Sequence, residues 1–418
     1  MDQSAVVVPS GCLPDWISFG VLAASVPRDV VDDAVAAHGR GARRSDGKLP
    51  PHVVLYFAMA MALFAEGDYE EVMAQLTDSL ARLGCWDGGW TAPTSGGITQ
   101  ARARLGWEVV AEVFGQVARP VADPLTRGAW LGGLRLVSVD GCEWDVPDSR
   151  TNAAEFGYPG TNGVGAFPKA RMVGLVETGS GAFLAARIGA VRGAGSGEQS
   201  LARRLYPLLE QDMLLLADRN FYSFADWCQA ADTGAQLLWR MEANLRLPCL
   251  QALPDGSYLS VVIDSAVKGA ARARLLQAAA DGEPLDPQRA RSVRVVEYEV
   301  PDRGTAATRE LICLATTLTD PTRAPAQDLA WAYHRRWEHE LANGQLKTVL
   351  RGPGRILRSK SPDMVRQEIY GYLLTHYALS ALICRAATEA DIDPDRVKVT
   401  RTVRIVRRRI DDPAAFSP

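Results

Sequence analysis

The sequence lacks the clusters of cysteine and histidine that bind structural zinc. Its seven cysteines are dispersed, and no two of them form a Cys-x-x-Cys pair. An odd, scattered set is typical of free thiols in a reducing compartment, whereas closely spaced pairs would indicate a disulfide framework or a zinc site. We therefore expect a protein of a reducing cytoplasm without a zinc site.

Long apolar runs, a leader sequence and a strong net charge are also missing. The most apolar run, residues 53–64, is shorter than the roughly 20 residues that a membrane-spanning helix needs. Residues 1–12 have no basic segment followed by an apolar one, as a signal peptide would. We therefore expect no membrane partner. The net charge is −3, so any binding of nucleic acid must depend on local basic patches.

Several familiar catalytic motifs are absent as well. The chain contains no Gly-x-Ser-x-Gly, no His-Glu-x-x-His, no P-loop and no Gly-x-Gly-x-x-Gly. These absences argue against a serine hydrolase, a zinc peptidase and a nucleotide-binding loop. His334 and His339 fit no metal-ligand spacing, and we expect them to be exposed or to support neighbouring residues.

The spacing of apolar residues divides the chain into a helical part and an α/β part. Residues 1–125 show helical spacing and are expected to form an all-helical amino-terminal domain. After them, short apolar runs alternate with helices, which is typical of an α/β domain. We expect residues 126–241 to form its first part and 242–320 a strand-rich insertion. Residues 321–360 would complete the domain, and 361–418 would form helices with a basic tail.

Two segments are suited to contact a nucleic acid. Residues 95–118 follow a turn rich in Gly, Pro and Thr, and their start carries Gln100, Arg102 and Arg104. This pattern fits a DNA-reading helix of helix-turn-helix type and, equally well, a solvated helix start. Residues 396–410 hold seven Lys or Arg and no acid. They favour a polyanion-binding surface, with a solvated terminal helix as the alternative.

Residues 330–350 place four functional side chains on one side of an expected helix. The four are Tyr333, Arg336, Glu340 and Lys347. At about 100° per residue they fall within about 60° of one another, whereas Glu338 lies on the other side. A carboxylate flanked by two cations and a phenol is unusual for a helix that faces a core. The pattern favours a helix that presents a metal-binding acid to a phosphate backbone.

Two further carboxylates follow apolar runs that indicate strands. Asp140 follows residues 134–139, and Asp218 follows residues 213–217. Ligands of α/β sheets bind at the carboxyl ends of strands, so acids held there suit a metal. Together with Glu340 they form a set of oxygen ligands that suits Mg²⁺ or Mn²⁺. A pair of such ions about 3.5–4 Å apart is the usual device for in-line attack on a phosphodiester. Strand-end aspartates are also common in turns, so spacing alone only suggests this chemistry.

The same residues resemble a known family. The four residues of the helix match the signature Tyr-x2-Arg-x3-Glu-x6-Lys. The segment 218–223 (DRNFYS) resembles the second-aspartate motif of these proteins, and 139–141 (VDG) resembles the first. Residues 98–106 and 358–369 are similar to further segments of the family. Over about residues 20–410, the chain resembles the DDE transposases of bacterial insertion sequences, in the YREK subgroup (the insertion-sequence-four family).

The resemblance implies a fold and a metal site. The fold class would be α/β, an RNase H-like catalytic domain with a β-strand insertion, preceded by the helical domain. Asp140, Asp218 and Glu340 would be the catalytic residues and would bind two Mg²⁺ (or Mn²⁺) ions per active site. Tyr333, Arg336 and Lys347 match residues that grip the DNA backbone. Arg240 lies on the strand after the second aspartate, where a relative uses an arginine to contact DNA, and is added to these DNA-binding residues.

The resemblance also implies partners. They would be double-stranded DNA, as terminal inverted repeats and target, and a second copy of the chain in a homodimer on paired ends. The protein would then be associated with the nucleoid. Some relatives hold a flipped base with a tryptophan on an insertion strand, but residues 310–316 contain none. Two alternatives remain: a metal-dependent nuclease that cuts without joining, and a domesticated DNA-binding protein on the same fold.

Overall fold

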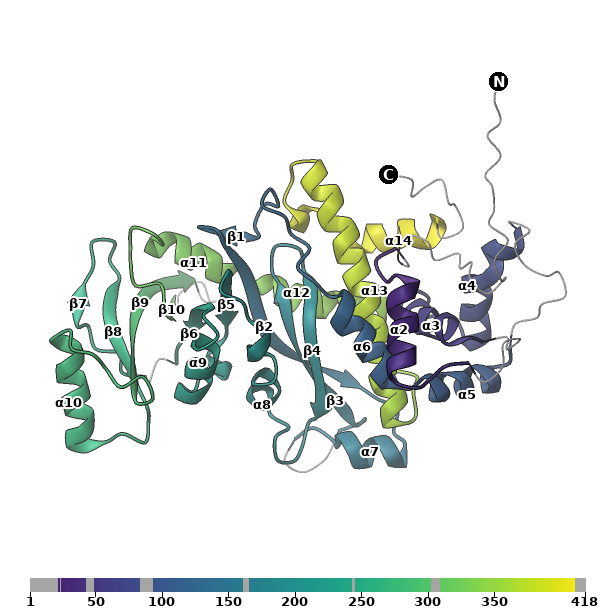
Figure 1. The fold of residues 1–418 in the computed structure, drawn as a ribbon, viewed down its shortest axis with the longest axis horizontal. Coiled ribbons are helices and arrows are strands. Elements are labelled where there is room, and N and C mark those ends of the chain that lie inside the picture. Colours follow the sequence, from purple (N-terminus) through teal and green to yellow (C-terminus); the bar gives the residue numbers. More distant parts are fainter. Residues whose placement is uncertain are drawn as a thin grey trace, which may run out of the picture.

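The computed structural model describes residue 22 and residues 24–42, 49–82, 93–160, 165–242, 245–301 and 309–409. Figure 1 shows an elongated molecule with strands in its middle and at one end and a group of helices at the other end. Within the described residues, no helix combines the length and the apolar character needed to cross a membrane.

The amino-terminal part is helical, as predicted. Its helices are α2 (Arg28–Ala37), α3 (Pro51–Leu63), α4 (Tyr69–Arg82), α5 (Ser95–Leu105) and α6 (Trp107–Val117). Asp68 caps α4, because its Oδ1 accepts hydrogen bonds from the backbone N–H groups of Glu70 and Glu71 at 2.9 and 2.8 Å. The helix expected over residues 95–118 is divided in two at Gly106, which has a positive φ of 78°.

These helices share a core with the carboxy-terminal part of the chain. Helix α3 is buried along almost its whole length and packs against α13 (Pro362–Glu389). The close approach depends on Gly371, where an added Cβ would lie 2.5 Å from the carbonyl oxygen of Ala58. The same apolar core includes Trp144 of the sheet. The helices at both ends of the sequence are therefore held against the sheet by one continuous core.

One mixed sheet forms the centre of the molecule. Its strands are β1 (Trp130–Leu131), β2 (Leu134–Asp145), β3 (Lys169–Glu177), β4 (Ala182–Ala190), β5 (Met213–Ala217), β6 (Gln236–Arg240), β7 (Gln251–Ala252), β8 (Tyr258–Ile263), β9 (Ala290–Pro301) and β10 (Arg309–Thr316). Their order is β4-β3-β2-β5-β6-β10-β9-β8-β7, and β1 pairs with β2. Strands β2, β5 and β6 are parallel, and the other pairs are antiparallel.

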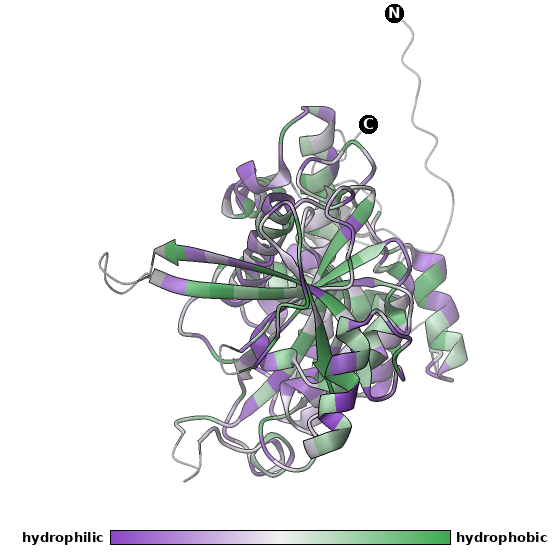
Figure 2. Cartoon of the chain, turned by 90° about the vertical axis from the view of Figure 1, so that its left-hand side faces the viewer, coloured by the Kyte–Doolittle hydropathy of each residue, from purple (hydrophilic) through white to green (hydrophobic). Residues whose placement is uncertain are grey.

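Helices cover both faces of the first five strands in this order. One face carries α8 (Glu198–Ala202) and α9 (Phe224–Ala231), whose side chains share a core with Val137 and Val139 of β2. The other face carries α11 (Ala326–His334), which packs on Leu136, and α12 (Trp337–Gly344). The colours of Figure 2 place green, apolar strands inside and more purple, polar residues on the surrounding helices. This strand order with helices on both faces is RNase H-like, so the predicted fold class is confirmed.

The predicted insertion extends the same sheet. Strand β10 pairs with β6, so β7 to β10 add to the edge of the RNase H-like strands. The insertion also contains a helix, α10 (Gly269–Ala280), which packs on β8 and which the sequence analysis missed. Its apolar periodicity is weak, because the segment is rich in Ala and none of its residues is fully buried.

The remaining helical elements are short or terminal. They are α7 (Arg150–Phe156), η2 (Tyr206–Leu208), η3 (Arg219–Phe221), the π-helix η4 (Gln345–Leu350), η5 (Pro394–Arg396) and α14 (Val399–Arg409). Of these, η3 and η4 matter most for the site, because η3 begins directly after Asp218 and η4 carries Lys347.

Candidate active site

Parallel pairing brings the two predicted aspartates to the same level of the sheet. Val139 of β2 is paired with Ala217 of β5, and each is followed by an aspartate, Asp140 and Asp218. Asp218 ends its strand, as predicted. Asp140 does not, because β2 continues to Asp145 along its antiparallel partner β3. The expectation that both aspartates end strands is therefore wrong for Asp140, but the two still lie side by side.

Helix α12 brings Glu340 to Asp140 through an arginine. Arg336 Nη2 lies 2.8 Å from Glu340 Oε1, and its Nη1 lies 3.4 Å from Asp140 Oδ2. The guanidinium is therefore a cation held between two carboxylates that come from different elements. Asp218 is close enough for its charge to act on both Arg336 and Tyr333. The predicted acids and the predicted arginine thus meet at one place.

Burial dominates the electrostatics of Asp140. It raises the pKa of this carboxyl to about 6, against the lowering effects of the Gly141 N–H, which donates to Oδ1 at 2.8 Å, and of Arg336. The charges of Glu198 and Glu340 act in the same direction as burial. Several acids therefore act on one another here, and this arrangement is stabilised by positive charge.

A break in the helix expected over residues 330–350 gives Arg335 and Arg336 different surroundings. The single helix expected over residues 330–350 is interrupted after His334, resumes at Trp337 and ends in the π-helix η4. Arg335 points away from Arg336: its guanidinium lies 2.7 Å from Asp393, from Asp395 and from Glu338. It also fills the space beside Gly128, whose φ is +81° and which has no room for a Cβ.

Glu338 lies outside the site. Its side chain is buried next to Arg335, and burial together with the neighbouring Asp395 raises its pKa to about 10. Glu340 is partly exposed beside Arg336. The structure therefore places Glu340, and not Glu338, with the two aspartates, in agreement with the helical-phase argument.

The other predicted backbone-binding residues surround the acids at different distances. Tyr333 is buried below Arg336, whose guanidinium carbon lies 5.9 Å from the ring centroid, and burial raises the pKa of the phenol. Lys347 is partly exposed on η4, and its charge acts on Cys142 of β2. Arg240 forms an ion pair with Glu310 across the β6–β10 boundary. Arg240 is thus engaged within the protein, whereas Lys347 has no ion pair among the described residues.

His339 ties α12 to the sheet. It is fully buried, and its Nδ1 lies 2.9 Å from Ser138 Oγ, two residues before Asp140. Burial lowers its pKa to about 3, so the ring is neutral. His339 is therefore not exposed; it is a supporting residue, the second of the two expectations. Only helical phase indicates the supporting role of His339: it directly precedes Glu340, so its side chain lies about 100° away from that of Glu340 around the helix.

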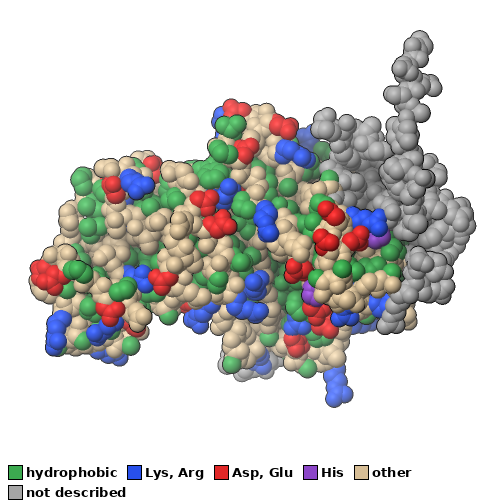
Figure 3. All heavy atoms as spheres, in the orientation of Figure 1, with side chains coloured by type: hydrophobic (Ala, Val, Ile, Leu, Met, Phe, Trp, Pro, Cys, Tyr) green, Lys and Arg blue, Asp and Glu red, His purple; other side chains and the backbone are tan. Residues whose placement is uncertain are grey.

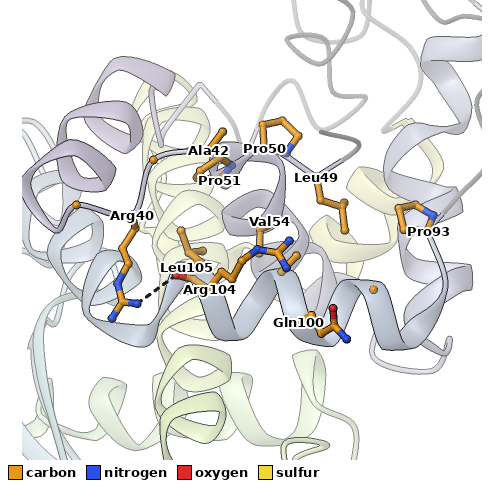
Figure 4. A pocket seen from close by; sticks show the side chains of 14 residues that line it. Arg40, Ala42, Leu49, Pro50, Pro51, Val54, Pro93, Gln100, Arg104 and Leu105 are labelled. Carbon is orange, nitrogen blue, oxygen red and sulfur yellow. Dashed lines mark hydrogen bonds between the residues drawn. The ribbon is translucent and has the colours of Figure 1, made fainter. Parts of the chain in front are cut away.

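The three residues of the amino-terminal part that were predicted to contact DNA divide into two exposed residues and one buried residue. Gln100 and Arg104 are exposed on α5 and line a cavity of about 510 Å³ together with Arg40 (Figure 4). Arg102 is fully buried: its Nε donates to Gln367 Oε1 at 2.8 Å and its Nη2 to Ser359 Oγ at 3.2 Å.

The prediction that Arg102 contacts DNA is therefore wrong. Its position on α5 matches the helical face of Ile98, Ala101 and Leu105, which points into the protein core. An arginine at such a position is retained because several acceptors satisfy its guanidinium, including the carbonyl oxygen of Met364. Two arginines separated by one residue thus have opposite environments.

The basic tail begins as an amphipathic helix. In α14, Val403 and Val406 are buried while Arg401 and Arg404 are exposed. Arg407 donates to the carbonyl oxygen of Leu63 at 2.6 Å, which ties the helix to α3. The rest of the tail, from 410, lies outside the described residues. On the face shown in Figure 3, positive and negative side chains are interspersed, in line with the small net charge.

The donor set fits a divalent cation by its chemistry. Three carboxylates are the ligands that Mg²⁺ and Mn²⁺ prefer, and a positive charge, the guanidinium of Arg336, already lies between two of them. Within the described residues, no three acids, histidines or cysteines converge closely enough to form a ready-made metal site. A cation would therefore require Arg336 to release the carboxylates.

Two family models match this chain. Residues 16–115 match the model of the insertion element 4 transposase N-terminal domain, and residues 131–377 match the transposase DDE domain. The two matches are separated by residues 116–130; the first covers the helical part, and the second covers the sheet together with α11 and α12.

Two curated relatives are transposases of Escherichia coli (strain K12). The chain is 28% identical to transposase InsG for insertion sequence element IS4 over 79% of this chain and 69% of the relative. It is 29% identical to the putative transposase InsZ over 35% of this chain and 50% of that protein. A piggyBac transposase in a synaptic complex with hairpin DNA aligns over 96% of this chain and 82% of its own, with 9% identity and a TM-score of 0.48. By these matches taken together, this chain belongs to the IS4 family of DDE transposases.

Proposed function

We propose that this transposase binds the terminal inverted repeats of its insertion sequence, cleaves the DNA there and transfers the 3′ ends to target DNA. The observation that supports this most is the meeting of Asp140, Asp218, Arg336 and Glu340 at one edge of the sheet. Three acids and an arginine from elements far apart in sequence would be costly to gather unless they act together.

The three acids would hold Mg²⁺ or Mn²⁺, in the family's manner as two ions. When bound, such ions activate the attacking oxygen and stabilise the leaving oxygen of a phosphodiester. The residues of the chain would position the three carboxylates for this chemistry. His339 and Ser138 fix α12 against β2, so that Glu340 stays level with Asp140. No side chain is needed as general base for a metal-activated oxygen.

Arg336 would have two partners in turn. Without a cation it neutralises Asp140 and Glu340, and its guanidinium is then shared between them. Once a cation takes that place, the guanidinium is free to bind a phosphate of the DNA backbone, for which its bidentate geometry is well suited. Lys347 and Tyr333 would contribute to the same backbone contact, and a second copy of the chain would hold the other end of the element.

The strand-transfer reaction distinguishes a transposase from a nuclease that only cuts. We expect the purified protein to join pre-cleaved terminal-repeat DNA to a supercoiled plasmid in the presence of Mg²⁺, because metal-activated 3′ hydroxyls and water attack phosphodiesters by the same in-line route. Gel analysis of labelled end DNA measures the joined product. Efficient cutting of the ends without any joined product would contradict the proposal and favour the nuclease.

The amino-terminal helices would bind the terminal repeats through the exposed side of α5. Arg104→Ala should weaken binding of end DNA by roughly 5-fold, with a smaller salt dependence, because one phosphate contact is lost. Fluorescence anisotropy at several salt concentrations measures both. Arg102→Ala is the matched control: it should instead lower the free energy of unfolding by about 3 kcal/mol, since buried acceptors lose their donor. Equal DNA affinity of Arg104→Ala and the parent protein would remove α5 from the interface.

A further inference from the structure

Arg351 is a buried arginine whose guanidinium has no acceptor. It directly follows η4, the π-helix that carries Lys347, and only 7% of its surface is exposed. Its Nε and Nη1 are enclosed by the protein and have no hydrogen-bond partner in the described part of the chain. Nη2 is not enclosed in this way, and it forms no hydrogen bond or ion pair with those residues either. A positive charge is therefore buried here without a counter-ion.

Two other buried arginines show what the guanidinium of Arg351 lacks. Arg102 and Arg294 are fully buried, and each donates to several acceptors. These acceptors are Gln367, Ser359 and the Met364 carbonyl for Arg102, and Asp255, Ser257 and the Ala324 carbonyl for Arg294. Glu368, a buried acid in the same region as Arg351, accepts from Ser359 instead. Because a charge taken out of water without a partner is unfavourable, the guanidinium of Arg351 requires a partner from outside the described residues.

The contact with Trp144 places Arg351 on the same face of β2 as Asp140. The guanidinium carbon of Arg351 lies 5.6 Å from the centroid of the Trp144 ring. Side chains alternate along a strand, and β2 pairs with β3 without a register shift, so Ser138, Asp140 and Trp144 share one face. Ser138 contacts α12 on that face. Arg351 therefore lies on the α12 side of the sheet, beside a strand position about 13 Å beyond Asp140.

Three cations follow one another along this face of β2. Arg336 lies against Asp140, with 3.4 Å between Nη1 and Oδ2. The charges of Lys347 and Arg351 both act on Cys142, two residues further along the strand. Lys347 and Arg351 are four positions apart, a spacing that places side chains on neighbouring turns of a helix. A row of positive charge therefore extends from the acids along β2 and ends at Arg351.

We propose that Arg351 binds a backbone phosphate at the element's DNA end and continues the contact made by Arg336 and Lys347. This inference rests on the proposed function and adds a residue that the four-residue signature does not contain. A phosphate oxygen is a strong acceptor for a guanidinium, and DNA phosphates are the anions that the proposed reaction brings to this face. The guanidinium breaks no hydrogen bond within the described residues when it turns toward a phosphate.

The salt dependence of DNA binding by the full chain tests this contact. Arg351→Met should weaken binding of terminal-repeat DNA about 10-fold and reduce the slope of log affinity against log salt by about 0.9, the value of one phosphate contact. Arg351→Lys keeps the charge and should keep the parental slope. Fluorescence anisotropy at several salt concentrations measures both quantities. Arg127→Met is the matched control, because it removes an exposed charge that is paired with Asp391 at 2.6 Å, and it should bind as the parent protein does.

Thermal unfolding of the free proteins separates DNA binding from a structural role of Arg351. Arg351→Met removes a buried charge that has no partner and places an apolar chain against the Trp144 ring. The unfolding midpoint should therefore equal the parent's or exceed it. A lower midpoint would show that the guanidinium stabilises the free protein, and it would overturn the inference.

Neutral phosphate analogues in the DNA identify the phosphate that Arg351 binds. Each duplex of a series carries one uncharged methylphosphonate in place of a phosphate near the end of the element. We expect a position at which this change weakens binding by the parent protein but causes no further loss for Arg351→Met, because both changes remove the same contact. Equal losses in the two proteins at every position would overturn the inference. Stabilisation of the parent by inorganic phosphate without such a position would indicate an ion site unrelated to DNA and would also overturn it.

The parent protein separates failure of this inference from failure of the proposed function. If the parent binds terminal-repeat DNA no better than a scrambled duplex, the proposed function fails and the assignment of Arg351 fails with it. If the parent prefers the repeat and Arg351→Met has the parental affinity and salt slope, only the assignment of Arg351 is overturned. Preference for the repeat together with the reduced slope of Arg351→Met supports both.

Discussion

Glu340→Gln should lower the rate of end cleavage by about 1,000-fold or more while the protein stays folded. The carboxylate lies beside Arg336 and Asp140, and an amide of the same shape cannot supply the negative charge that a divalent cation requires. Partial exposure of Glu340 means that the substitution leaves no unpaired charge in the core. Single-turnover cleavage of labelled end DNA measures the rate, and thermal unfolding measures stability.

Glu338→Gln is the matched control, because it tests whether the loss of cleavage is specific to Glu340. Both glutamates lie on α12, two residues apart, but burial raises the pKa of Glu338 to about 10, so its carboxyl is protonated near neutral pH. Glutamine closely imitates that neutral form. Cleavage by Glu338→Gln should therefore stay within about 3-fold of the parent rate, well below the effect of a lost metal ligand. The reverse order of the two effects would assign the third acid to Glu338.

Arg335→Ala and Arg336→Ala should have opposite consequences. Arg335 is mostly buried and lies 2.7 Å from both Asp393 and Asp395, so its loss leaves two acids without a counter-ion. We expect the free energy of unfolding to fall by about 2–3 kcal/mol, less than for a fully buried pair because both aspartates are partly exposed. Chemical denaturation measures this value.

Arg336→Ala should keep most of the stability and lose activity. Its guanidinium would bind a phosphate of the DNA at the site. Removal of a group that contacts the reacting phosphate typically lowers the rate about 100-fold. Cleavage and end binding by Arg336→Ala should both fall, with a denaturation midpoint close to the parent's. If Arg336→Ala unfolds more easily than Arg335→Ala and still cleaves DNA at the parental rate, then the division of roles between the two arginines is wrong.

Much of the fold follows from local patterns. The β2, β5 and β6 runs are short and apolar because they are buried on both faces, and the helical part shows regular spacing. The extent of β2 beyond Asp140 was not predictable, because polar residues there are held in the strand by pairing with β3 rather than by their own propensity. Helix α10 was missed because its Ala- and Arg-rich sequence has little apolar periodicity.

The site was predictable only in part. Helical phase selects Glu340 over Glu338 even though the helix is broken, because Arg336 and Glu340 both lie close to the same turn of α12. The buried role of Arg102 was not predictable, since its partner Gln367 lies 265 positions away in the sequence.

A crystal structure of the protein with pre-cleaved end DNA and Mn²⁺, with the ions located by anomalous scattering, tests the central claim most directly. The account predicts Mn²⁺ in contact with Asp140, Asp218 and Glu340, and Arg336 moved from the carboxylates to a DNA phosphate. Mn²⁺ bound instead among Glu338, Asp393 and Asp395, or DNA placed away from the three acids, would contradict it.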